Sequence, residues 1–436
     1  MCKPRPGRES VNQTSHHSNI RRGGLRRLPP SPHGLKAGLR AACAGGLLLL
    51  NLICLTSVTA AEGRQDAIIV GLDAEVSHTT STADDAIRVG MQIALEEVNA
   101  AGGVLGRPLT MDVRDNRSVP WRGVENAVSF GANPSVGAFL TGKYSPVVLE
   151  QLKPAHASRL ILLDAWAAAD GITKNGYQPN VAFRLGLNDT MAISALMLHA
   201  SRSGLRKPGL FLPNNGWGRS CLEAAEKHAR SRGYRISAVE WYQWGDQTPS
   251  FAGQYEKLAR AGADHVLMVA NEGEGAQLLK DIAALPKPRR LPVLSHWGIL
   301  GSNFPAMAGP ALRAVDLRIV TTISYAAAPT PRAKTLLEKA ARRLGGLPPE
   351  RLTSAIGVAH AYDLIHLLVL AIRKAGSTER DAVRLALENI ASYNGAMKNY
   401  VRPFSATRRE ALNIADLRIV RYGADGALLP YQAGTR

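Results

Sequence analysis

The chain has 436 residues, of which 45% are hydrophobic and 20% are charged, a composition typical of globular proteins. That length exceeds what one compact hydrophobic core usually supports, so we expect two domains. Much of the formal net charge of +18 lies at the front, where residues 1–60 hold nine Lys or Arg against Glu9. Because the rest of the chain has no run of Lys or Arg longer than a pair, its basic charge predicts a solvated surface and no nucleic-acid interface.

Residues 1–60 read as a targeting segment. A basic stretch is followed by an apolar run over residues 41–55, broken by Asn51, and then by small residues that end in a V-x-A site. This order is typical of a secretory signal peptide, so we predict export to the periplasm with cleavage near Ala60. The alternative is an uncleaved membrane anchor, since the apolar run and its small-residue tail together reach about the length of a bilayer. The basic stretch is unusually long for a leader. A start codon assigned too far upstream would explain this length.

The cysteines are placed unevenly. Cys2, Cys43 and Cys54 lie in the leader, which leaves Cys221 for the mature chain. We therefore expect no intramolecular disulfide and no cysteine-based metal site there. Cys221 has no histidine close to it in sequence, and we interpret it as a small buried hydrophobic residue.

From residue 66 onward, short apolar runs alternate with amphipathic stretches. A first series predicts strands at residues 67–71, 109–113, 136–140 and 160–163, with helices at 84–100, 121–130 and 147–158. A second series predicts helices at residues 190–203, 217–232, 251–260 and 275–284, with strands at 209–212, 235–241, 265–269 and 291–294. Such alternation needs crossover connections, and these imply parallel sheets covered by helices on both faces. Two series in succession predict an α/β fold of two doubly wound, Rossmann-like lobes.

The last quarter of the chain has too few elements for a third domain, so we expect it to complete the two lobes. It predicts strands at residues 318–321 and 417–421, helices at 331–344, 353–374 and 379–390, and a polar stretch after the last helix. Asp425-Gly426 indicates a hairpin turn into residues 428–431. We predict a first lobe over residues 61–187 and 321–398, and a second over residues 188–320 and 399–432.

The segment from Asn99 to Leu109 joins the first helix to the second strand. Its pair Gly102-Gly103 can end the helix in a left-handed conformation, and Gly106-Arg107-Pro108 can turn the chain into a strand. The whole string NAAGGVLGRPL also resembles the hallmark of the leucine/isoleucine/valine-binding protein family, the type I periplasmic receptors of branched-chain amino-acid ABC transporters.

Other segments resemble the same family in the same order. They are Asp115 to Ala127, Gly142-Lys-Tyr-Ser145, Asn214-Asn-Gly-Trp217-Gly218, Gly262-Ala-Asp264 and Ala361-Tyr362-Asp363. The resemblance covers roughly residues 66–432. It implies that two lobes, hinged on crossover strands, close over a small-molecule ligand that a membrane permease then receives. We further expect a monomer that needs no cofactor and no metal and is not an enzyme.

Open α/β sheets bind their ligands at the carboxyl ends of the strands. The candidate ligand-binding residues on the loops at those ends are Ser77, Tyr144, Ser145, Asp164, Trp166, Trp217, Asn271, Glu272 and Trp297. The backbone amides after Ser145, where a helix starts, can hold an anionic group without a cation. Ser145 itself has two compatible interpretations, as the cap of the helix that starts near residue 147 and as a ligand contact.

Three tryptophans depart from the family pattern. Trp297 stands where members that bind amino acids place a carboxylate for the ligand ammonium, and Trp217 stands at the family's tyrosine position. Trp166 occupies a loop that usually carries small residues. Each tryptophan by itself can be explained by packing, but together they predict a planar, aromatic or cationic ligand, because indole faces offer stacking and cation–π attraction.

The missing carboxylate has three possible replacements, Asp164, Glu272 and Glu274. An amino-acid-like ligand therefore stays open beside an aromatic or cationic one. The residues do not identify the ligand.

Motifs of common enzymes are absent from the sequence. There is no G-x-S-x-G elbow, no P-loop and no H-E-x-x-H pair of zinc ligands. His360 and His366 share a predicted helix, but a spacing of six residues points them about 120° apart, which does not favour a two-histidine metal site. Two alternatives to a transport role remain: a sensory receptor or regulator with the same fold, and an enzyme on a doubly wound fold.

Overall fold

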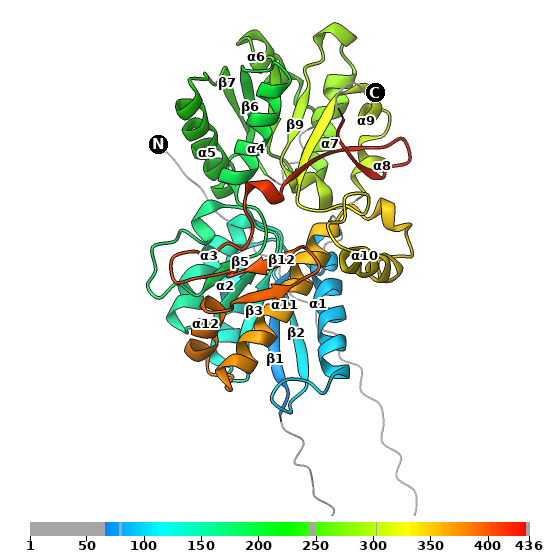
Figure 1. Cartoon of the computed structure of the whole chain (residues 1–436). Helices are drawn as coiled ribbons and strands as arrows, with labels where there is room; N and C mark the ends of the chain where they lie inside the picture. The colour runs from blue at the N-terminus through cyan, green and yellow to red at the C-terminus, as the bar shows by residue number, and fades with distance from the viewer. Residues whose placement is uncertain (1–65, 78–80, 245–248, 302, 433–436) are drawn as a thin grey trace, which may run out of the picture. The chain divides into compact units, whose positions relative to one another are not determined.

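The structure is a computed structural model that describes residues 66–77, 81–244, 249–301 and 303–432 (Figure 1). The predicted signal peptide and its cleavage site at Ala60 lie outside the described residues. The predicted α/β architecture is confirmed, because the described residues form two large sheets, one to each lobe, that are mainly parallel.

The first lobe is built on a five-stranded parallel sheet in the order β2-β1-β3-β4-β5. Its strands are β1 (Ile68–Ala74), β2 (Leu109–Asp115), β3 (Val136–Thr141), β4 (Ile161–Asp164) and β5 (Ala182–Arg184). Successive side chains of β1 point to opposite faces, so Ile68 and Val70 join one apolar cluster while Ile69 packs against another. Both faces of this sheet are therefore buried.

Helices cover the two faces of the first sheet in pairs. Helices α1 (Ala83–Ala100) and α11 (Ala355–Ala375) pack together on one face, and α2 (Pro120–Ala132) and α3 (Ser145–Ala157) pack on the other. Helix α1 ends where the sequence predicted, since Gly102 and Gly103 have φ values of 89° and 75°. Helix α11 is apolar and long enough to cross a membrane, but 89% of its most apolar window is buried inside the protein, as in a core helix.

The second lobe is built on a seven-stranded sheet in the order β14-β13-β10-β9-β8-β6-β7. Its parallel strands are β6 (Pro208–Pro213), β7 (Ala238–Tyr242), β8 (His265–Met268), β9 (Val293–Ser295) and β10 (Leu317–Thr321). The antiparallel pair β13 (Arg418–Tyr422) and β14 (Leu428–Pro430) extends one edge. The predicted hairpin turn is confirmed there, with Gly426 at a φ of 84°.

The helices of the second lobe follow its strands in the predicted alternation. They are α4 (Asp189–Arg202), α5 (Gly216–Arg232), α6 (Ala252–Arg260), α7 (Glu272–Ala283), α8 (Phe304–Ala308) and α9 (Ala311–Ala314). The described chain returns to the first lobe for α10 (Pro331–Arg343), α11, α12 (Arg380–Glu388) and a hairpin of β11 (Ser392–Asn394) and β12 (Asn399–Val401).

The described chain passes between the lobes three times: from β5 to α4, from β10 to α10, and from β12 to β13. Two of these segments are bonded to each other. The Arg184 N–H donates to the Arg409 carbonyl at 2.8 Å, and the Ala411 N–H donates to the Arg184 carbonyl at 3.0 Å. Paired crossing segments of this kind are suited to act as a hinge. The residue boundaries predicted above for the two lobes remain a prediction.

Each helix and strand predicted from the sequence has a counterpart whose ends lie within three residues of the prediction. The sequence analysis missed β5, α8, α9 and the β11–β12 hairpin, which it took for a polar stretch. These elements are short, so they carry too little periodicity to recognise.

Candidate ligand-binding site

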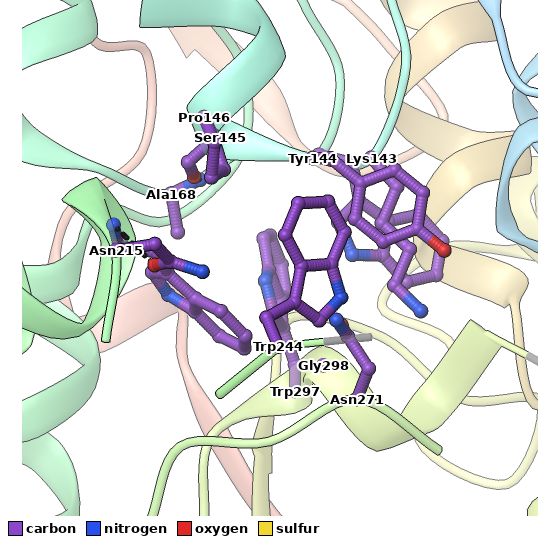
Figure 2. A pocket seen from close by; sticks show the side chains of 12 residues that line it. Lys143, Tyr144, Ser145, Pro146, Ala168, Asn215, Trp244, Asn271, Trp297 and Gly298 are labelled. Atoms are coloured by element: carbon purple, nitrogen blue, oxygen red, sulfur yellow. Dashed lines mark hydrogen bonds between the residues drawn. The ribbon is translucent and has the colours of Figure 1, made fainter. Parts of the chain in front are cut away.

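A small pocket, with about 20 Å³ of free space, lies where the carboxyl ends of strands from the two sheets face each other (Figure 2). Its lining residues follow β3, β4, β6, β7, β8 and β9, and are Lys143, Tyr144, Ser145, Pro146, Trp166, Ala168, Asn215, Trp217, Trp244, Asn271, Trp297 and Gly298. This is the edge at which open α/β sheets bind ligands. That space holds about one water molecule, so a solute can enter only if the lobes move apart.

Aromatic side chains supply much of the lining: Tyr144, Trp166, Trp217, Trp244 and Trp297 (Figure 2). The rings of Trp166 and Trp297 lie 5.9 Å apart at 48°, and each residue is only 1% exposed. Tyr144 and Trp244 face each other at 5.1 Å. The buried indole N–H of Trp166 has no acceptor among the described residues.

Ser145 ties the two lining loops of the first lobe together. Its hydroxyl oxygen accepts from the backbone N–H groups of Ala168 and Ala169, each at 3.1 Å. The prediction that Ser145 caps its helix is wrong: α3 begins at Ser145 itself, and its N-cap residue is Tyr144. A ligand contact of the Ser145 hydroxyl remains a prediction.

Two asparagines stand at the helix starts of the second lobe. The side-chain oxygen of Asn215 accepts from the N–H groups of Trp217 and Gly218 and so caps α5. Asn271 precedes α7 but makes no capping bond with its side chain, which lies at the cavity (Figure 2). Together with α3, three helix N-termini are directed at this cavity, and their partial positive charges favour an anionic group there.

An ion pair joins the two lobes beside the cavity. The Lys143 ammonium lies 2.5 Å from a carboxylate oxygen of Glu272, and their side chains are 2% and 5% exposed. Ser81 strengthens the link, since its hydroxyl contacts the same Glu272 oxygen at 2.9 Å, and Thr82 donates to the Gly301 carbonyl. We call Ser81, Thr82, Lys143, Glu272 and Gly301 the interlobe latch.

The latch depends on a close approach of the backbone at Gly301. A Cβ atom there would lie 2.2 Å from the Glu272 carboxylate and 2.7 Å from the Lys143 ammonium, so a side chain would have to displace the ion pair. On the opposite side, the buried carboxylate of Asp84 accepts from the Lys143 backbone N–H at 2.8 Å and fixes the loop. The loop that carries Lys143 and the backbone at Gly301 therefore both position the ion pair.

Of the nine candidate residues, six lie around the cavity: Tyr144, Ser145, Trp166, Trp217, Asn271 and Trp297. Glu272 does not line it, because its carboxylate is held by Lys143. Ser77 is exposed and hydrogen-bonds to Asp115.

Asp164 also lies outside the cavity lining. Its side chain is fully buried and lies 3.1 Å from the Arg184 guanidinium. Burial raises the pKa of Asp164 to about 6, against the opposing attraction of Arg184. Asp164 therefore supports the sheet from within and is not placed to replace the family's carboxylate.

The sequence analysis missed Lys143, Asn215 and Trp244 as individual lining residues. Lys143 and Asn215 lie inside motifs that it singled out, but only their neighbours were selected. Trp244 follows β7, whose carboxyl end the strand rule would have included.

The fold also brings together groups that are distant in sequence, directly behind Trp217. The indole N–H of Trp217 donates to a carboxylate oxygen of Asp189 at 3.1 Å. Asp189 in turn lies within 4.8 Å of the ligand atoms of Cys221 and His296, and all three residues are buried. The expectation that Cys221 is buried is confirmed. Burial, followed by the adjacent Asp189 carboxylate, raises the pKa of its thiol well above the ordinary value.

Two doubly wound lobes with a cavity between their strand ends define a type I periplasmic binding fold, the architecture of solute-binding proteins. Residues 68–427 match the family described as periplasmic binding protein, and the chain belongs to this family. The resemblance to leucine/isoleucine/valine-binding proteins is likewise confirmed.

Relatives and solved structures agree on this assignment. The chain is 24% identical over 326 residues to the leucine-, isoleucine-, valine-, threonine- and alanine-binding protein of Pseudomonas aeruginosa, covering 74% of this chain and 82% of that protein. A type 1 periplasmic binding protein from Bordetella pertussis superposes with a TM-score of 0.74 at 21% identity, over 84% of this chain and all of the other. A solute-binding protein of an ABC transporter from R. palustris, solved with 4-hydroxybenzoate, superposes with a TM-score of 0.69 at 15% identity. The match covers 84% of this chain and 96% of that protein.

Proposed function

We propose that this chain is the periplasmic substrate-binding component of an ABC-type importer, and that it captures a small planar aromatic acid between its lobes for delivery to a membrane permease. The observation that carries the proposal is the interlobe cavity with its five aromatic side chains. The family consists of substrate-binding proteins, so the expected chemistry is reversible capture and release. Closure excludes water from the solute, and opening releases it.

The aromatic part of the proposed ligand is supported by the tryptophans. Indole faces offer large, rigid surfaces for stacking on a flat ring. An amino-acid-like ligand has less support, because Trp297 stands where amino-acid-binding members place a carboxylate for the ammonium. The carboxylate of Glu272 is already paired with Lys143. A flat solute is also what the R. palustris protein holds in its structure.

The acidic part of the proposed ligand is supported by the polar lining. The starts of α3, α5 and α7 place positive ends of helix dipoles at the cavity. A cationic solute would gain cation–π attraction from the indoles, but it would meet these positive groups as well.

The test is to identify the bound solute directly. Protein purified without added ligand is denatured, and the released small molecules are identified by mass spectrometry. Thermal-shift assays then compare benzoate-type acids, branched-chain and aromatic amino acids, and quaternary amines. We expect an aromatic acid to raise the Tm. At 100 times its Kd, it should add about 2.7 kcal/mol to the free energy of unfolding.

The outcomes separate the parts of the proposal. A Tm rise with leucine or isoleucine and none with aromatic acids would contradict the aromatic acid but keep the binding function. Chromatography shows whether the protein consumes the solute during incubation. Such consumption would contradict a pure binding role. Intrinsic fluorescence should change on binding in the wild type and equally in Trp121→Phe, since Trp121 is 56% exposed on α2, away from the cavity.

A further inference from the structure

The Asp189–Cys221–His296 group lies behind the cavity wall and has no part in the proposed solute site. Asp189 is the first residue of α4, Cys221 lies in α5, and His296 directly follows β9. Each of the three residues is completely buried. Their ligand atoms, a carboxylate oxygen, the sulfur and a ring nitrogen, all lie within 4.8 Å of one another.

The contact between His296 and Asp189 is close but poorly aligned for a hydrogen bond. Nε2 of His296 lies 3.2 Å from Oδ1 of Asp189. Even so, neither ring nitrogen of His296 has a hydrogen-bond partner among the described residues, and nor does Oδ2 of Asp189. Buried polar atoms without partners are rare in folded proteins and call for an explanation such as a bound ion.

A shared ion accounts for both features. When two donor atoms bind one metal, each points its lone pair at the metal, so the atoms lie near each other without a straight N–H···O line between them. Thiolate sulfur, imidazole nitrogen and carboxylate oxygen are the ligands of protein-bound Zn²⁺. The charges also balance, because one thiolate and one carboxylate neutralise a divalent cation, which a buried site requires.

We propose that Asp189, Cys221 and His296 form a zinc-binding site. This proposal departs from the expectation that the mature chain has no cysteine-based metal site, because a mixed ligand set needs only a single thiolate. The Trp217 indole N–H, which donates to Asp189 Oδ1 at 3.1 Å, acts as an outer partner that orients the carboxylate. With three protein ligands, the fourth position is left to a water molecule.

The site has a structural consequence for the cavity. Zinc links α4, α5 and the loop after β9, and that loop continues directly into Trp297. The ring of His296 also packs edge-on against Trp217 at 5.2 Å. A bound ion therefore fixes Trp217 and Trp297, two of the three tryptophans by which the second lobe lines the cavity.

The test measures metal on the full chain with no solute added, so its result does not depend on the proposed transport role. Protein is treated with a chelator, incubated with ZnCl₂, freed of unbound metal and analysed by inductively coupled plasma mass spectrometry. We expect one zinc per chain. Replacement by Co²⁺ should give a thiolate-to-cobalt charge-transfer band, which reports the sulfur ligand directly.

Variants assign the ligands. Cys221→Ala and His296→Asn should each lower zinc affinity by more than the roughly 10- to 100-fold that loss of an outer partner costs. Cys221→Ala should also abolish the cobalt band, which separates Cys221 from the leader cysteines Cys2, Cys43 and Cys54. His228→Asn is the matched control, because His228 is another buried histidine and contacts Ser194 instead of this group; it should bind zinc as the wild type does.

Two results would overturn the proposal. One is a wild-type chain that retains no zinc and shows no thiolate–cobalt band, a measurement that needs no variant to fold. The other is equal zinc binding by the wild type and by Cys221→Ala with unchanged circular dichroism. In either case the three groups would be a buried ion pair beside a thiol.

Discussion

At the residue scale, Trp217 and Trp297 carry the clearest prediction for ligand binding. Their rings line the cavity while the rest of each side chain is buried, so truncation removes stacking surface that nothing nearby replaces. We expect Trp217→Ala and Trp297→Ala each to weaken binding by more than about 1.5 kcal/mol, or roughly tenfold, as for a buried aromatic anchor. Isothermal titration calorimetry with the solute released from the protein measures this loss, and Trp121→Phe serves as the control. Unchanged affinity in both variants would exclude the aromatic site.

His360 provides a prediction on stability and pH. Its Nδ1–H donates to the Ala165 carbonyl at 2.8 Å, and its Nε2 accepts from the Thr322 hydroxyl at 2.9 Å. Burial lowers the pKa of His360 from 6.5 to about 4, so the folded protein keeps the ring neutral. The unfolded chain binds a proton below pH 6.5, and the stability from this group is therefore lost as the pH falls from about 6.5 to about 4.

The variant His360→Gln removes that proton from the unfolded state. Between pH 7 and pH 5 the wild type should lose about 2 kcal/mol more free energy of unfolding than the variant, whatever the variant's stability at pH 7. Urea denaturation at both pH values measures the difference. The same pH dependence in the two proteins would show that His360 is not held neutral in the folded state.

The residue scale also shows where sequence reasoning stops. The strand rule selects loops, but it does not tell which side chain on a loop turns to the cavity and which turns to the core. At the end of β4, Trp166 on the following loop lines the cavity, whereas Asp164, the last residue of the strand, turns inward to Arg184. Hydrophobic periodicity has no information about that choice, because it depends on packing between elements far apart in the sequence.

At the element scale, the interlobe latch predicts a measurable coupling. Lys143→Met leaves the buried Glu272 carboxylate without a counter-ion, and Glu272→Gln does the same to the Lys143 ammonium. Each single variant should lower the free energy of unfolding by about 3 kcal/mol, the order found when one partner of a buried ion pair is removed. The double variant should lose less than the two single losses combined, by at least about 1 kcal/mol.

Urea denaturation of the four proteins gives this double-mutant cycle. The matched control is Glu96 with Arg343, a pair between α1 and α10 whose nitrogen and oxygen lie 2.6 Å apart but are much more exposed. Its coupling should stay within about 1 kcal/mol. Additive losses for Lys143 and Glu272 would mean that the latch contributes no coupling between the lobes.

Most elements of the fold could be predicted, because each long helix or buried strand carries its own periodicity. The β11–β12 hairpin could not, since its order comes from one distant carboxylate. Asp363, buried in α11, accepts from the backbone N–H groups of Ala396 and Met397 and from the Tyr400 hydroxyl. Each strand of the hairpin has only three residues, too few to show a periodicity, and the Asp363 side chain that binds them lies some 30 positions away in the sequence.

At the scale of the whole molecule, the latch bears on how the protein opens and closes. A ligand-free receptor of two hinged lobes usually samples open and closed forms, and the solute shifts that balance by its preference for the closed form. Here the chain's own ion pair bridges the lobes beside the cavity. An ion pair that bridges the lobes stabilises the closed form, so we expect the ligand-free protein to populate that form to a larger extent.

This predicts a compact ligand-free protein. In small-angle X-ray scattering without solute, the wild type should have nearly the radius of gyration that it has with solute. Lys143→Met should have a larger radius, because the unpaired Glu272 carboxylate favours the open, hydrated form, and solute should reduce it again. Arg289→Met is the control, since Arg289 pairs with Glu256 on the surface of the second lobe. A wild type that contracts on binding as much as Lys143→Met does would show that the ion pair forms only once the solute has closed the lobes.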